Sequence, residues 1–91
     1  MDIFENDDVG YRSWLLAHRQ GYVVNTSKPP GAGYLMLHFA SCHTVTGEPA
    51  SGSTWTAGQY AKACSENRKE LDDWAQQSFG ESLTPCGSCF R

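Results

Sequence analysis

The chain has 91 residues, with 7 Lys and Arg against 10 Asp and Glu, and its formal net charge is −3. This length allows one domain and excludes a second, and a core this small is marginal without a disulfide, a metal or a partner. The mild charge excludes both an acidic tail and a nucleic-acid polycation.

The first eight residues, MDIFENDD, are acidic and lack the basic and apolar regions of a secretory signal. No apolar stretch approaches the roughly 20 residues that span a bilayer. We therefore expect a cytoplasmic protein with no membrane partner. Thiols stay reduced in that compartment, where clustered cysteines hold metal more often than they form disulfides. Two disulfides are the alternative if the protein is exported.

A first helix is predicted over about 7–19. Asn6 or Asp7 can accept hydrogen bonds from its free N–H groups, and Gly21 is expected to end it in a left-handed conformation. Apolar and aromatic side chains recur at helical spacing and predict one buried face. They are Tyr11, Trp14, Leu15 and His18.

Two strands are predicted next, over about 22–25 and 34–39, paired antiparallel through the loop TSKPPGAG. Residues 44–59 are rich in Thr, Gly, Ser and Pro and predict a long loop around Trp55. The segment 60–64 is a third strand candidate.

A second helix is predicted over about 66–79, with Ser65 or Asn67 as its cap and Gly80 at its end. Asn67 and Glu70 have the spacing of a capping box. The tail after this helix is expected to be irregular or extended. Together these elements predict one α+β domain over 1–91, with a small two- to three-stranded antiparallel sheet, two helices and a zinc staple.

The sharpest motif is Cys86-Gly87-Ser88-Cys89, within a predicted C-terminal zinc knuckle at 85–89. Two cysteines at this spacing around a tight turn present both sulfurs to one side, as a tetrahedral zinc ion requires. A thioredoxin-like redox motif has the same pattern, but it places its first cysteine at a helix N-terminus. Only Phe90 and Arg91 follow Cys89, so no helix can follow the motif.

The other ligands must come from elsewhere in the chain. Cys42 follows the second predicted strand, and we predict Cys42, Cys86 and Cys89 as three ligands of one structural Zn²⁺ per chain. His38 and Cys64 compete for the fourth position. An extended segment would project His38 to the same face as Cys42. Cys64 precedes the second helix, whose N-terminus favours thiolate, although it could equally be a small core residue.

These residues resemble the Ada-type metal-binding domain and its small bacterial relatives over roughly the second half of the chain. That pattern has a first ligand, a Cys four residues later, a helix and a terminal P-C-x-x-C. Here the matching pieces are 38–42, the helix around 71–75 and 85–89. The resemblance implies His38, Cys42, Cys86 and Cys89 as ligands. Cys64 has no counterpart in it, the linker before the helix is longer, and no methyl-accepting thiolate is identified here.

The sequence favours a binding or accessory module over an enzyme. We expect a protein or nucleic-acid partner to bind Trp55 in the long loop. The same partner is expected to bind Arg68 and Lys69, two basic residues that follow each other in the sequence. Trp55 could equally fold back onto a thin core. No small-molecule substrate is evident. The alternative function is a thiol-based redox sensor or enzyme that uses Cys86 and Cys89 or Cys64.

Overall fold

The structure, a computed structural model, describes residues 1–46 and 55–90. The predicted 44–59 loop therefore lies partly outside the described residues, at 47–54. The elements in chain order are β1 (Asp2–Phe4), α1 (Asp8–Ala17), β2 (Tyr22–Ser27), β3 (Leu35–Phe39), α2 (His43–Thr46), β4 (Tyr60–Ser65), α3 (Arg68–Phe79) and β5 (Thr84–Pro85).

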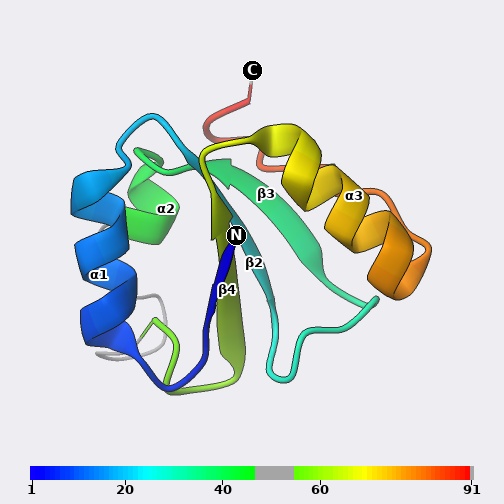
Figure 1. Ribbon diagram of the computed structural model, residues 1–91, viewed down its shortest axis with the longest axis horizontal. Coiled ribbons are helices and arrows are strands. Elements are labelled where there is room, and N and C mark those ends of the chain that lie inside the picture. The colour runs from blue at the N-terminus through cyan, green and yellow to red at the C-terminus, as the bar shows by residue number, and fades with distance from the viewer. Residues whose placement is uncertain (47–54, 91) are drawn as a thin grey trace.

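One sheet, with strand order β1-β4-β2-β3-β5, runs through the middle of the molecule. Its pairs are antiparallel except for β3 and β5, which are parallel. As Figure 1 shows, α1 and α2 lie on one side of the sheet and α3 lies on the other. The protein is therefore an α+β domain with a helical layer on each face of a mixed sheet.

The predicted two- to three-stranded antiparallel sheet with two helices was wrong. The sheet has five strands and is mixed, and the described residues contain three helices. The strands that were missed, β1 and β5, have only three and two residues. Such short segments carry no periodic pattern of their own, so their pairing with β4 and β3 depends on tertiary context.

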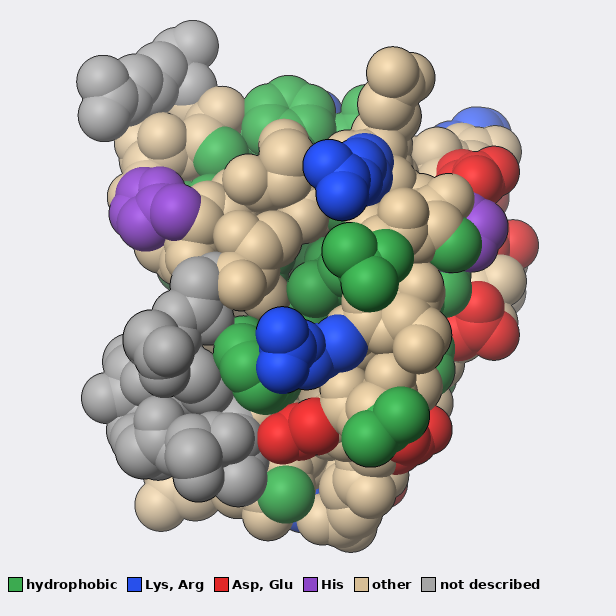
Figure 2. Space-filling view, turned by 90° about the vertical axis from the view of Figure 1, so that its left-hand side faces the viewer, with side chains coloured by type: hydrophobic (Ala, Val, Ile, Leu, Met, Phe, Trp, Pro, Cys, Tyr) green, Lys and Arg blue, Asp and Glu red, His purple; other side chains and the backbone are tan. Residues whose placement is uncertain are grey.

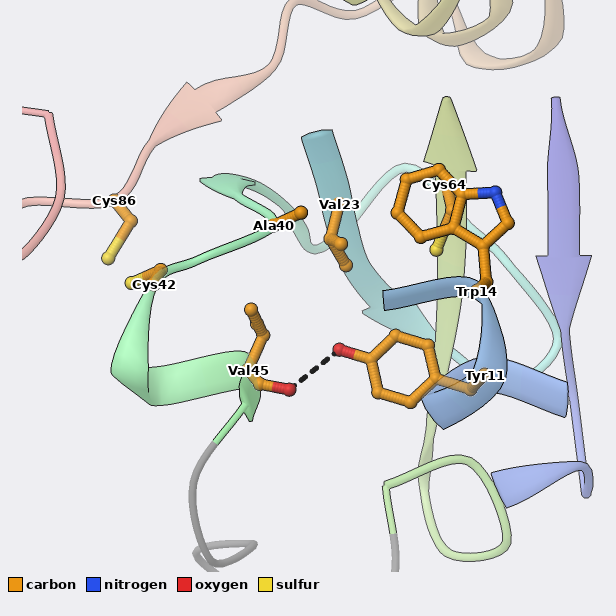
Figure 3. Packing of buried hydrophobic residues seen from close by; sticks show 8 residues of the cluster. All are labelled: Tyr11, Trp14, Val23, Ala40, Cys42, Val45, Cys64 and Cys86. Carbon is orange, nitrogen blue, oxygen red and sulfur yellow. Dashed lines mark hydrogen bonds between the residues drawn. The ribbon is translucent and has the colours of Figure 1, made fainter. Parts of the chain in front are cut away.

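Two clusters of buried side chains fill the spaces on the two faces of the sheet. The cluster beneath α1 and α2 comprises Tyr11, Trp14, Val23, Ala40, Cys42, Val45, Cys64 and Cys86. The cluster beneath α3 comprises Val24, Leu35, Leu37, Ala63, Leu71 and Ala75. Because neighbouring strand residues alternate between faces, Val23 and Val24 belong to different clusters. The first cluster contains three of the four cysteines (Figure 3).

The N-terminus of α1 is anchored by two aspartates. Asp7 is the cap, and its carboxylate accepts a hydrogen bond from the Gly10 N–H at 2.8 Å. The neighbouring Asp8 carboxylate accepts from the Trp55 N–H at 3.1 Å and from the Thr56 N–H and hydroxyl at 2.6 and 2.7 Å. Asp8 thus joins the helix to the segment that leads into β4.

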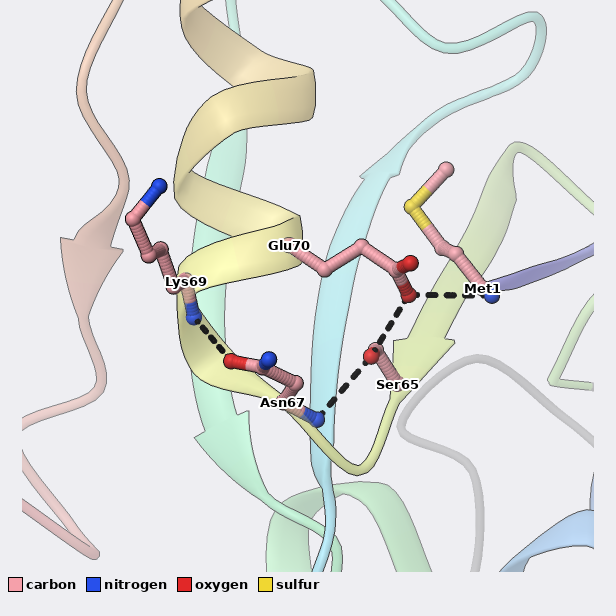
Figure 4. Close-up of polar contacts among 5 residues, drawn as sticks. All are labelled: Met1, Ser65, Asn67, Lys69 and Glu70. Atoms are coloured by element: carbon pink, nitrogen blue, oxygen red, sulfur yellow. Dashed lines mark hydrogen bonds and ion pairs between the residues drawn. The ribbon is translucent and has the colours of Figure 1, made fainter.

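The N-terminus of α3 confirms Asn67 as a cap but not the capping box. The Asn67 side chain accepts a hydrogen bond from the Lys69 N–H, and the Asn67 N–H donates to the Ser65 hydroxyl. The Glu70 carboxylate accepts from that same hydroxyl at 2.8 Å and pairs with the Met1 amino group at 2.9 Å (Figure 4). Glu70 therefore links α3 to β1 and β4 instead of closing back on Asn67.

Gly80 and Gly21, the two glycines that were predicted to end helices, differ in backbone conformation. Gly80 adopts a left-handed conformation with φ of 67°, as predicted. Gly21 does not, so the predicted left-handed stop there was wrong. A Cβ at Gly21 would lie 2.8 Å from the Trp14 ring and 3.1 Å from the Ser65 carbonyl oxygen. The sequence needs glycine at 21 because α1 approaches the sheet closely there.

We expect Gly21→Ala to lower the free energy of unfolding by about 1–3 kcal/mol, since the added methyl overpacks a tight contact. Gly33→Ala is the matched control, because a Cβ there meets nothing within 4 Å. Urea unfolding of both variants, saturated with zinc, measures the difference. Equal stability of the two variants would show that the close approach at Gly21 is not limiting.

No helix in the described ranges combines the length and the apolar character needed to cross a bilayer.

Candidate metal centre

His38 and Cys42 are brought together by a turn at the end of β3. His38 lies within β3 and is buried, while Cys42 follows a turn at 40–41. The Cys42 N–H donates to the Phe39 carbonyl at 2.9 Å, and the Cys42 carbonyl accepts from the N–H groups of Val45 and Thr46 at the end of α2. The expectation of an extended 38–42 segment was wrong, because the chain reverses before Cys42.

Cys86 and Cys89 reach the same place through β5. The Cys86 N–H donates to the Leu37 carbonyl at 2.8 Å and so fastens the tail beside β3. A turn over 87–89 follows, and the Phe90 N–H donates to the Cys86 carbonyl at 2.9 Å. The Phe90 ring stacks on Phe39 with centroids 4.2 Å apart. The knuckle is thus held against β3 on both sides of the two cysteines.

The four side chains form one compact group. The candidate ligand atoms of His38, Cys42, Cys86 and Cys89 all lie within 4.8 Å of one another. Two ligand sulfurs of a tetrahedral zinc ion are about 3.8 Å apart when each Zn–S bond is about 2.3 Å. Figure 3 shows the Cys42 and Cys86 sulfurs directed toward each other. The group is therefore positioned to bind a metal ion.

Backbone N–H groups point at two of the sulfurs. The Ser88 N–H donates to the Cys86 sulfur at 3.4 Å, and the Phe39 N–H donates to the Cys89 sulfur at 3.5 Å. Burial acts to raise the pKa of Cys86, but hydrogen bonds from the N–H groups of Ser88 and Cys89 and with the Cys89 and Cys42 thiols outweigh it and lower that pKa to about 7. Burial and the neighbouring Cys42 raise the pKa of Cys89 to about 11. Thiolates this close together repel one another, so all of them can be ionised only if a cation lies between them.

His38 is held in the form that binds metals. Burial, assisted by the positive charge of Lys62, lowers the pKa of His38 to about 4, so its imidazole is neutral near pH 7. Its Nδ1 lies 3.1 Å from the Thr44 hydroxyl, which also lies 3.1 Å from the Cys42 sulfur. Thr44 therefore links two candidate ligands through its hydroxyl and fixes the orientation of the His38 ring.

We expect Thr44→Val to weaken zinc binding by roughly tenfold or more, because loss of the hydroxyl frees the orientation of the His38 ring. Thr46→Val is the control, since the Thr46 hydroxyl donates to the Cys42 carbonyl and contacts no candidate ligand atom among the described residues. Competition with a chromophoric chelator measures both affinities. An unchanged affinity for the Thr44 variant would contradict a positioning role.

Cys64, the other residue considered for the fourth position, lies elsewhere. It is on β4, fully buried in the cluster that contains Trp14, and it is not part of the group of four. Burial raises the pKa of its thiol above the ordinary range. Figure 3 shows its sulfur well away from those of Cys42 and Cys86. Cys64 therefore has the environment of a core residue. None of the four cysteines forms a disulfide.

Comparison of the chain with models of protein families, with curated proteins and with solved structures finds no match in any of the three.

The three predicted partner-binding residues do not share one surface. Trp55 is half-buried against the cluster beneath α1 and α2, whereas Arg68 and Lys69 lie on α3, across the sheet. Lys69 pairs with Asp73 at 2.8 Å, and Arg68 lies 3.8 Å from Asp72. These basic side chains are thus engaged within their own helix.

Sequence reasoning missed Lys62, a lysine with 5% of its surface exposed. Its amino group donates to the Asn25 side-chain oxygen at 2.6 Å and to the Trp55 carbonyl at 3.0 Å. It also lies 5.7 Å from the Tyr11 ring centre. The sequence indicated burial of the Lys62 side chain only through its place between Ala61 and Ala63, in the strand candidate 60–64.

Proposed function

We propose that this protein is a small recognition or accessory module whose fold is closed by one structural zinc ion. The observation that carries the proposal is the convergence of four ligand atoms within 4.8 Å from two segments that are far apart in sequence. His38 and Cys42 come from the end of β3, and Cys86 and Cys89 come from the knuckle after β5. The Ada-type resemblance implies the same four residues.

The donor set favours zinc over harder cations. Three thiolates and one imidazole are soft ligands that suit zinc, whereas magnesium and calcium take oxygen ligands. A catalytic zinc keeps one coordination position for water, while four protein ligands complete a tetrahedron. The proposed site is therefore closed, and its contribution is to stability.

The environment of the thiols supports a binding module over a thiol enzyme. A reactive cysteine lies in an electropositive, partly exposed place, often at a helix N-terminus. Cys86 is buried and precedes a turn at 87–89, and Cys64 has no exposed surface. The pKa of Cys86 is lowered to about 7, but its thiol is buried within the group of four candidate ligands, and the thiol of Cys64 is fully buried with a raised pKa.

Elemental analysis with thiol counting tests the proposal on protein purified without added metal. We expect one zinc per chain, masked thiols in the folded, zinc-bound protein, and four titratable thiols after chelation and denaturation. Circular dichroism before and after chelation measures the structural role. A protein with no zinc, or one whose spectrum is unchanged after complete removal of zinc, would overturn the proposal. Fast alkylation of one cysteine in a metal-free, folded protein would support the thiol enzyme instead.

A further inference from the structure

A hollow of about 340 Å³ opens on the α1 side of the molecule, next to the metal-ligating segment. Three parts of the chain form its walls: α1 with the turn after it, the segment 40–46, and Trp55. Its lining residues are Arg12, Leu15, Leu16, Arg19, Ala40, Ser41, Thr46 and Trp55. Figure 2, which views this face, shows blue basic side chains flanking green hydrophobic ones. We call this feature the α1 groove.

The α1 groove combines an apolar floor with positive charge. Leu16 is 70% exposed, and Leu15 and Trp55 are half-buried beside it. The Arg12 guanidinium lies 5.0 Å from the centre of the Trp55 ring, which orients it along the wall. Within the described residues, neither Arg12 nor Arg19 forms an ion pair with a carboxylate. Two guanidinium groups that form no ion pair with a described carboxylate thus lie beside exposed apolar surface.

We propose that the α1 groove binds an acidic peptide segment of a partner protein, with one apolar side chain on Leu15, Leu16 and Trp55 and carboxylates at Arg12 and Arg19. This inference deepens the proposed function and rests on it for the recognition role. The volume fits a few side chains, and arginine forks match carboxylate geometry. The pairing of an aromatic and arginines is typical of the energetic centre of protein interfaces.

A nucleic-acid partner fits this surface less well. Phosphate-backbone binding relies on several cations spread over one face. Of the other basic side chains among residues 1–46 and 55–90, Lys62 is buried, Lys28 donates to Asn6 and to the Thr56 carbonyl, and Arg68 and Lys69 face carboxylates on α3. The α1 groove is left with two guanidinium groups, enough for a short acidic segment and too few for a nucleic-acid backbone.

The groove is also coupled to the metal centre. Ala40, Ser41 and Thr46 in its wall belong to the segment that carries Cys42, and the Tyr11 hydroxyl donates to the Val45 carbonyl at 2.8 Å and ties that segment to α1 (Figure 3). Release of Cys42 from a metal would loosen this wall. Recognition at the α1 groove is therefore expected to depend on zinc.

The test is a titration of ¹⁵N-labelled, zinc-loaded protein with the capped peptide acetyl-Glu-Glu-Leu-Glu-Glu-amide, followed by NMR. We expect shifts at Leu15, Leu16, Ser41 and the Trp55 indole. The same peptide with Lys in place of Glu, the same peptide with Ser in place of Leu, and an oligothymidylate are the comparison ligands, and each should bind at least fivefold more weakly. Equal or tighter binding of any of them, or no shifts at these residues, would overturn the proposal.

A matched pair of double variants locates the effect. Arg12→Gln with Arg19→Gln should weaken binding of the acidic peptide at least fivefold, whereas Arg68→Gln with Lys69→Gln, the same charge change on α3, should leave it within twofold. If both double variants lose the same affinity for the acidic peptide, net charge alone explains the binding and the proposed groove is refuted. Zinc content is measured on every sample. Peptide binding by zinc-free protein would contradict the proposed zinc module alone, and zinc-loaded protein that does not bind would contradict the groove alone.

Discussion

Cys86→Ser is expected to leave the protein largely unfolded at 25 °C even with zinc present. The serine hydroxyl is a poor ligand for zinc, and a structural zinc supplies on the order of 10 kcal/mol to a small domain. The total stability of a folded domain is of the same order, about 5–15 kcal/mol. Loss of one ligand also releases β5, whose two residues have few other contacts to hold them.

Cys64→Ala provides the control for this variant. Cys64 is more deeply buried than Cys86 but lies outside the group of four. Its replacement leaves a small cavity and should cost about 1–2 kcal/mol without loss of zinc. Circular dichroism and zinc content, measured for both variants, separate the two roles. A zinc-free Cys64 variant beside a zinc-loaded, folded Cys86 variant would reverse the assignment of the ligands.

Lys62→Met is expected to change how stability depends on pH. Burial lowers the pKa of Lys62 to about 8, although the nearby Cys64 and Asp8 act to raise it. The unfolded chain keeps the ordinary value near 10.5, so between these two pH values the unfolded state binds more protons than the folded one. The penalty for burying the charge is therefore full below pH 8 and declines as pH rises toward 10.5.

The stability of the natural protein relative to Lys62→Met should accordingly rise by about 2 kcal/mol between pH 7 and 9.5. Taking the difference between the two proteins removes contributions shared by both, including those of Tyr11 and Cys64, whose pKa values are raised by burial. Urea unfolding at the two pH values measures it. If the difference in unfolding free energy between the two proteins is the same at both pH values, Asn25 and the Trp55 carbonyl solvate the Lys62 amino group as well as water does.

Local chemistry predicted the long elements of this fold. The face of α1 formed by Tyr11 and Trp14 is buried, Gly80 ends α3 in a left-handed conformation, and β2 pairs antiparallel with β3. Each of these depends on spacing or residue type within one segment. The antiparallel pair also follows from the short connection between its strands.

What the sequence could not predict depends on distant partners. β1 and β5 are strands only because β4 and β3 offer free edges, and Glu70 bonds Ser65 and Met1 instead of its own helix end. At the metal centre, cysteine spacing identified Cys86 and Cys89. His38 and Cys64 both pair with Val23 and so share one face of the sheet; the choice between them depended on the strand order, which places β3, and not β4, beside β5. One short turn after Phe39 decides where Cys42 lies.

The order of the ligands along the chain has a consequence during synthesis. His38 and Cys42 leave the ribosome before the whole of β4 and α3, and Cys86 and Cys89 leave after them. A nascent chain that stops before residue 84 therefore carries only two of the four candidate ligands and lacks β5. If the proposed zinc ion is bound, it can complete its four ligands only after translation has passed Cys89.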